Sequence, residues 1–150
     1  MSSDAASILL VVEDDPNDVN FIRRGLAKVG IGEQVRYARD GGEALAYLGG
    51  EGVYQDRTLH PLPSLMVLDL KLPKKPGLEV LAWVRNDSRL KDLPVVIFTS
   101  SKEEGDVRRA RELGVEAYHV KPVDYRDFTE IVKSIGLLWI NLTKRAGAPG

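Results

Sequence analysis

Five short apolar runs alternate along this chain with stretches in which apolar residues recur at helical spacing. The first run, 8–13, is apolar and rich in β-branched residues up to its last position, which is typical of a strand buried on both faces of a sheet. Strands that alternate with helices form a parallel sheet with right-handed crossovers. We therefore predict a doubly wound α/β fold of five parallel strands and five helices. The expected strands are residues 8–13, 34–38, 64–69, 95–99 and 115–120.

Signals for helix starts fill the segments between these strands. Asp15 before Pro16 is typical of an N-cap followed by proline at the first helical position. The four residues that begin at Asp40 have the spacing of a capping box. Ser100 and Ser101 each precede a glutamate by three residues, so the next helix has two possible caps. The expected helices are residues 16–29, 40–48, 77–87, 102–112 and 124–143.

The connection at 49–63 is rich in Gly and Pro and is long for a compact domain, so it is either functional or mobile. The sequence shows no internal repeat and no low-complexity tract, and 150 residues is the usual size of one domain. We expect a single domain at 1–145, with a C-terminal helix extension at about 137–145. A disordered tail is expected at 146–150.

The composition excludes several classes of protein. Because the chain has no cysteine, it has no disulfide, thiolate metal site or cysteine nucleophile. Its net charge of −1 provides no general attraction for nucleic acid or for an anionic membrane. No apolar run approaches the roughly 20 residues of a membrane span, and the N-terminus does not resemble a signal peptide. We therefore expect a cytoplasmic protein with no nucleic-acid or membrane partner.

The ends of the predicted strands carry acidic residues. In an open doubly wound sheet, ligands bind at the carboxyl ends of the strands, where the strand order reverses. In the flavodoxin-like order 2-1-3-4-5, the first and third strands meet there, and they end at Glu13, Asp14 and Asp69. Carboxylates packed together repel one another, and a hard divalent cation such as Mg²⁺ resolves the repulsion. With no cysteine and two histidines, a softer metal is not expected.

Two further residues suit a phosphate at the same place. Lys121 ends the fifth strand, where lysine is rarely placed without a partner, and its ammonium could reach Asp69 or a phosphate on it. Thr99 offers a hydroxyl to the same oxygens. A carboxylate nucleophile, a divalent metal, a lysine and a hydroxyl are the parts that phosphoryl transfer needs. Each signal is weak alone, because strand-end acids are often helix caps and strand-end lysines usually lie on the surface.

With these segments the chain resembles the receiver domain of two-component response regulators, from residue 7 to about 136. The resemblance implies a phosphorylation-dependent signalling switch whose partner is a sensor histidine kinase. It implies no enzyme activity beyond self-phosphorylation and self-dephosphorylation. The matching segments are Val12-Glu13-Asp14-Asp15-Pro16, Leu68-Asp69-Leu70-Lys71-Leu72-Pro73 with Gly77, Phe98-Thr99-Ser100-Ser101, and Ala117-Tyr118-His119-Val120-Lys121-Pro122.

The resemblance also implies which residues accept the phosphate and hold the metal. Asp69 would be the phospho-acceptor and would carry the phosphate as an acyl phosphate. The metal would be Mg²⁺, for which Mn²⁺ or Ca²⁺ can substitute. Its protein ligands would be Glu13, Asp14, Asp69 and the backbone carbonyl of Lys71.

A second group of residues would respond to the phosphate. The resemblance implies that Lys121 pairs with the phosphate, and its bond to Pro122 is commonly cis in the family. Thr99 would move toward the phosphate, and Tyr118 would turn inward behind it. This pair would form a switch that phosphorylation biases between two packings.

The loop at 49–63 and the segment at 137–142 resemble a narrower subgroup, the stand-alone receivers that partner phytochrome-type sensor kinases. This resemblance implies a bacteriophytochrome as the kinase. The loop could contact a kinase or merely close the connection, and the sequence leaves both alternatives open.

Lys71 departs from the family pattern, in which this position often carries asparagine or another uncharged residue. Its side chain would lie near the phosphate and could exclude or misorient the hydrolytic water. We therefore hypothesise slower self-dephosphorylation than in a Lys71→Asn variant.

The last expected helix suggests self-association. Its apolar stripe continues to a C-terminal end that is apolar almost all round, and no further domain follows to bury that end. We predict a symmetric homodimer in which these ends dock on the neighbour. The alternative is a helix that folds back on its own domain. The predicted dimer residues are Leu138, Trp139 and Leu142.

Two other functions fit part of the pattern. A Mg²⁺-dependent phosphatase or mutase also uses a strand-end aspartate, but it usually has a second acid two residues later, where this chain has Lys71. A flavodoxin-like cofactor binder would need a Ser/Thr/Gly-rich loop after the first strand. This chain has three acids there, which would repel phosphate unless a metal intervenes.

Overall fold

The computed structural model describes residues 7–147, with side chains described as far as residue 144. Five strands form one parallel sheet in the order β2-β1-β3-β4-β5. The predicted doubly wound sheet and its strand order are therefore confirmed. The strands are β1 (Ile8–Val12), β2 (Val35–Ala38), β3 (Pro63–Leu68), β4 (Val95–Thr99) and β5 (Ala117–Val120).

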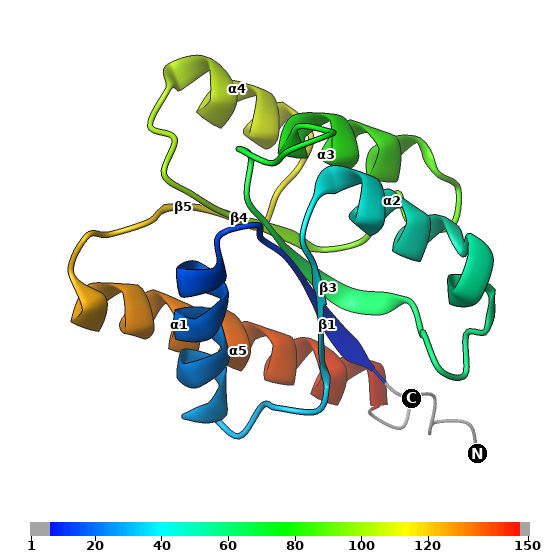
Figure 1. Ribbon diagram of the computed structural model, residues 1–150, viewed down its shortest axis with the longest axis horizontal. Coiled ribbons are helices and arrows are strands. Elements are labelled where there is room, and N and C mark those ends of the chain that lie inside the picture. The colour runs from blue at the N-terminus through cyan, green and yellow to red at the C-terminus, as the bar shows by residue number, and fades with distance from the viewer. Residues whose placement is uncertain (1–6, 148–150) are drawn as a thin grey trace.

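Helices cover both faces of this sheet (Figure 1). On one face lie α1 (Pro16–Ala27) and α5 (Tyr125–Gly147), packed side by side. On the other lie α2 (Gly41–Gly49), α3 (Gly77–Asn86) and α4 (Glu104–Glu112). Strand side chains alternate between two apolar cores, as the period of a strand requires. No helix within residues 7–147 is long and apolar enough to cross a membrane.

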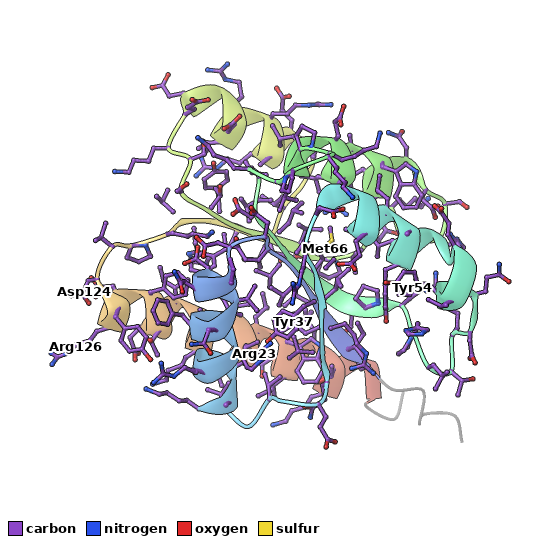
Figure 2. All side chains as sticks on the ribbon, in the orientation of Figure 1. Arg23, Tyr37, Tyr54, Met66, Asp124 and Arg126 are labelled. Carbon is purple, nitrogen blue, oxygen red and sulfur yellow. The ribbon has the colours of Figure 1, made fainter. Side chains whose placement is uncertain are left out.

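The central strands are buried on both faces. All five residues of β1 and of β4 are inaccessible to solvent, as their unbroken apolar runs predict. Met66 of β3 lies in the middle of the sheet and is fully buried (Figure 2). The sheet is therefore a rigid support for the residues that follow each strand.

Two of the predicted helix caps are present and one is absent. The Asp15 carboxylate accepts hydrogen bonds from the backbone N–H groups of the first turn of α1, and Asp40 accepts one from Glu43. Neither predicted serine caps α4, because that helix begins later, at Glu104, and has no side-chain cap. Ser101 instead donates its hydroxyl to Asp106 inside the first turn of α4.

The connection expected as a loop at 49–63 is ordered by its own contacts. It includes a 3₁₀ helix, η2 (Gly52–Gln55). The Arg57 guanidinium donates to the carbonyls of Tyr47, Leu48 and His60, so it binds the C-terminal end of α2. These contacts support the interpretation that the segment closes the connection, and kinase contact remains a prediction.

The C-terminal helix folds back on its own domain. Trp139 is only 6% exposed and belongs to the core beneath α1 and α5, while Leu138 and Leu142 pack against the same core. The domain itself therefore buries Trp139, one of the predicted dimer residues, while Leu137 stays 51% exposed and the dimer remains a prediction. The helix also continues to Gly147, past the expected start of the tail, and residues 148–150 lie outside the described part.

Candidate functional site

Three carboxylates meet at the carboxyl edge of the sheet, the side on which the strands end. Residues Val12 and Leu68 pair across β1 and β3, and the Asp69 N–H donates to the Val12 carbonyl at 3.1 Å. Glu13 and Asp69 therefore leave neighbouring strands at the same level. One oxygen from each of Glu13, Asp14 and Asp69 lies within 4.8 Å of the others. Glu13 and Asp69 are buried and Asp14 is exposed, so the cluster is open on one side.

Lys121 extends from the end of β5 into this cluster. Its Nζ lies 2.7 Å from a Glu13 oxygen, 2.9 Å from an Asp69 oxygen and 2.8 Å from an Asp18 oxygen, and its side chain is 10% exposed. The predicted contact between Lys121 and Asp69 is present. Asp18 was not predicted, although its place in the first turn of α1, directly after the strand-end acids, was a signal for it.

Burial changes the protonation chemistry of this group. Burial raises the pKa of Glu13 from 4.5 to about 7, although the nearby Lys121 ammonium acts in the opposite direction. Burial alone would lower the pKa of Lys121, but its carboxylate partners outweigh that effect and raise it. Lys121 therefore stays charged, while Glu13 takes up a proton more readily than an ordinary glutamate unless a second cation is present.

The cluster fits a hard divalent cation. Its donors are carboxylate oxygens, which such a cation prefers. Among the acidic and histidine side chains that the structure describes, these three lie close enough together to share one metal ion. Glu13 and Asp69 are close, buried and alike in charge, and a single lysine does not balance them together with Asp14. His60 and His119 lie outside the cluster, so its side-chain donors are all carboxylate oxygens.

The loop after β3 aims the Asp69 carboxylate. The Lys71 N–H donates to Asp69 Oδ1 at 3.1 Å, while Lys121 occupies Oδ2. The loop returns so closely that a Cβ on Gly77 would lie 2.2 Å from the Asp69 carbonyl oxygen, so only glycine fits there. The Lys71 side chain is exposed. Metal binding by its carbonyl remains a prediction.

The predicted switch residues lie beside the cluster, on the next strands of the sheet. Thr99 ends β4 and is fully buried, and its Oγ1 accepts a hydrogen bond from the Ser101 N–H at 3.4 Å. Tyr118 of β5 donates its hydroxyl to the Ser101 carbonyl at 2.9 Å. Ser101 thus connects both residues through its backbone. The Lys121–Pro122 bond is trans, like every peptide bond in the described part, so the expected cis bond is absent.

Comparison with known proteins agrees with this geometry. The model of the response regulator receiver domain matches residues 9–133. Response regulator Rcp1 of Synechocystis sp. is 36% identical over 138 residues, 92% of this chain and 92% of Rcp1.

Solved structures are similar over the same range. The crystal structure of the phosphorylated cyanobacterial phytochrome response regulator RcpA has a TM-score of 0.83 and 38% identity, and the match covers 91% of this chain and 95% of RcpA. The Mn²⁺-bound form of Rcp1 has a TM-score of 0.82 and 37% identity, over 89% of this chain and 94% of Rcp1. The family match at residues 9–133 includes Glu13, Asp69 and Lys121 at the carboxyl edge.

Proposed function

The chain belongs to the response regulator receiver family, and from that premise we propose that Asp69 accepts a phosphoryl group from a sensor histidine kinase. Receiver domains are signalling proteins rather than enzymes that turn over an external substrate. The observation that carries the proposal is the position of Asp69. Its buried carboxylate lies at the carboxyl edge of the sheet, with Lys121 on one oxygen and the Lys71 N–H on the other.

The transfer requires an oxygen nucleophile and neutralisation of charge. An Asp69 oxygen attacks the phosphorus of a phosphohistidine, so a P–O bond forms while the P–N bond breaks. The departing imidazole nitrogen takes a proton from solvent, and the product is an acyl phosphate on Asp69. Lys121 neutralises negative charge that collects on the phosphoryl oxygens. The phosphoryl transfer to Asp69 therefore needs no general acid from this chain.

Glu13, Asp14 and Asp69 would hold the divalent cation, together with the Lys71 carbonyl. When bound, Mg²⁺ supplies positive charge to the phosphoryl oxygens, and Mn²⁺ would do the same, as the Mn²⁺-bound Rcp1 relative suggests. Glu13 and Asp14 offer carboxylate oxygens beside Asp69, and Asp14 lies at the open side of the cluster, which favours a cation over an anion there. The raised pKa of Glu13 supports the same assignment, because burial penalises the charged carboxylate more than Lys121 compensates it, and a bound cation would add compensation.

The phosphate then acts on Thr99 and Tyr118. Thr99 would turn its hydroxyl toward the phosphoryl oxygens and give up the hydrogen bond from Ser101. Tyr118, bound to the Ser101 carbonyl, would respond to the same displacement. The output is a change of packing at the start of α4, read by a protein partner.

We also propose that the partner kinase is of the phytochrome type, such as a bacteriophytochrome. The support is the RcpA relative, which is described as a cyanobacterial phytochrome response regulator and matches this chain over 91% of its length. Rcp1 is matched over 92% of its own length, which supports a stand-alone receiver. A cytoplasmic location follows from the kinase partner.

Homodimerisation stays a prediction, but its residues need revision. Trp139 is part of the core, so a Trp139→Glu variant would unfold the domain rather than test an interface. Leu137 on the same helix is 51% exposed and is the better probe. A dimer formed through this helix should be lost in Leu137→Glu, as measured by light scattering. A variant that stays dimeric and folded would contradict the role of this helix.

The phospho-acceptor is tested by intact-protein mass after incubation with acetyl phosphate. Wild type should gain one phosphate, about 80 Da, only with Mg²⁺. Asp69→Asn should gain none, since an amide is not a nucleophile of this kind. An Asp92→Asn variant, which changes an exposed aspartate at the opposite edge of the sheet, serves as the control and should gain phosphate as wild type does. Failure of wild type to gain mass would overturn the proposed function.

A further inference from the structure

Asp18 is an acidic residue of the site for which the receiver chemistry above gives no role. It lies in the first turn of α1, its side chain is 22% exposed, and its Oδ2 is 2.8 Å from Lys121 Nζ. It is not part of the acidic group that fits a metal. The contact joins residues 103 positions apart in the sequence, so it is a product of the fold and not of local structure.

The number of hydrogen-bond donors on Lys121 makes this contact significant. An ammonium has three N–H donors, and three carboxylates lie within 2.9 Å of it, one for each donor. Two of these carboxylates change during phosphorylation: Glu13 would turn to the cation, and Asp69 would become an acyl phosphate. Asp18 is the partner that neither event alters. The contact between Asp18 and Lys121 can therefore persist through both events.

Asp18 is also firmly placed. The Asp15 carboxylate caps the N-terminal turn of α1 by accepting from the N–H of Asp18 itself. Farther along α1, the Arg23 guanidinium lies 5.1 Å from the centre of the Tyr37 ring on β2 (Figure 2). Gly25 lets α1 approach α5 so closely that a Cβ there would lie 2.7 Å from a Val132 methyl group. The helix cannot shift without breaking these contacts, so the Asp18 carboxylate is a fixed reference point for Lys121.

We propose that Asp18 is a positioning residue that orients the Lys121 ammonium toward the phosphoryl group on Asp69. With one N–H fixed by Asp18, the lysine has fewer directions in which to point, and a donor remains aimed at the reacting oxygens. Without Asp18 that N–H would turn to water at the open rim of the site. The inference rests on the proposed function, because it assigns Asp18 a part in the same phosphoryl transfer.

The test is the rate of phosphate incorporation from acetyl phosphate at saturating Mg²⁺, followed by intact mass. Asp18→Ala should lower the rate constant about five- to tenfold, because the ammonium loses one charge-assisted hydrogen bond. Asp18→Asn should stay within about twofold of wild type, since its amide oxygen still accepts from Lys121. Asp15→Asn is the matched control. It removes one charge from the same turn, keeps a good helix cap and should leave the rate unchanged.

A second measurement separates positioning from a structural role. In a Lys121→Gln background, Asp18→Ala should cause no further loss of rate, because the residue through which it acts is gone. A loss that persists in that background would overturn the inference, and so would an Asp18→Ala rate equal to or above that of wild type. Thermal unfolding of each variant confirms that the compared proteins are folded. If wild type itself gains no phosphate, the proposed function fails, and this inference fails with it.

Discussion

The two edges of the sheet use long cationic side chains in opposite ways. At the carboxyl edge, Lys121 donates to three carboxylates, and two of them, Glu13 and Asp69, change when a metal or a phosphoryl group binds. At the amino edge, Arg57 and Arg85 donate to backbone carbonyls, which nothing in the proposed reaction alters. The first edge can therefore change state while the second holds its shape.

Arg85 shows most clearly how the amino edge is held in place. Its Nε donates to the Leu113 carbonyl at 2.6 Å, and its terminal nitrogens donate to the carbonyls of Leu93 at 2.7 Å and of Gly114 at 3.1 Å. These carbonyls lie at the C-terminal end of α4 and in the segment before β4. Carbonyls left free at a helix end need such partners. The proposed switch moves the start of α4, and Arg85 holds its other end.

Replacement of Lys121 should give the largest effect. Lys121→Met leaves three carboxylates close together without their cation, so we expect a loss of about 3 kcal/mol in the free energy of unfolding at neutral pH. Mg²⁺ should restore part of this loss, because it supplies charge to Glu13 and Asp69. Urea unfolding with and without Mg²⁺ measures both effects. Lys133→Met, which breaks an exposed pair with Glu130, should change little. A loss that Mg²⁺ leaves unchanged would show that uncompensated charge at the carboxyl edge is not its cause.

Replacement of Arg85 should give a smaller loss that metal does not restore. Arg85→Met removes hydrogen bonds from a charged donor to backbone carbonyls. These carbonyls lie at the rim of a cavity, so water replaces part of the lost bonds. We expect the free energy of unfolding to fall by about 2 kcal/mol. The phosphorylation rate should stay that of wild type. The control is Arg89→Met, which removes an exposed pair with Asp87 and should stay within about 0.5 kcal/mol. Rescue of Arg85→Met by Mg²⁺ would show that the two edges are coupled.

The two edges should also differ in how their contributions to stability depend on pH. The pKa of Glu13 is about 7 in the folded protein against an ordinary 4.5, so the folded state binds the proton more tightly than the unfolded state. This contribution is fully present below pH 4.5 and is lost as the pH rises through 7. Without Mg²⁺, Glu13→Gln should gain about 1–2 kcal/mol relative to wild type between pH 5 and pH 8. Arg85→Met should follow the wild-type slope. A constant difference between Glu13→Gln and wild type would contradict the raised pKa.

Much of this architecture can be predicted from the sequence because local and global signals agree. The apolar runs identify the strands, and Asp15 and Asp40 mark helix starts through contacts with neighbours two or three residues away. Strand-end acids converge by topology alone, so Glu13 and Asp69 were predictable before any distance was known. Asp18 had a weaker signal, its place in the first turn of α1, because its contact with Lys121 depends on where α1 lies over the sheet.

Two predictions from local patterns were wrong because the pattern did not reveal the partner that the side chain finds in the fold. Trp139 looked available because the end of the helix is apolar on every side, yet the domain is long enough to bury it. Ser101 had the spacing of a cap, yet its hydroxyl donates to Asp106 and its carbonyl accepts from Tyr118.

The smallest expected effect concerns Lys71 at the carboxyl edge. Its side chain is exposed, and its N–H donates to Asp69. Unlike Lys121, it should matter for kinetics and not for stability. In Lys71→Asn, loss of phosphate from Asp69 should be about threefold faster, because a long cationic side chain no longer obstructs the hydrolytic water, an effect of under 1 kcal/mol on the barrier. Lys75→Asn removes the same charge from the same loop and should leave the rate unchanged. Decay of the phosphorylated mass after removal of acetyl phosphate measures both rates. If Lys71→Asn loses phosphate at the wild-type rate or more slowly, the side chain does not shield the acyl phosphate, and the contribution of Lys71 is confined to its backbone.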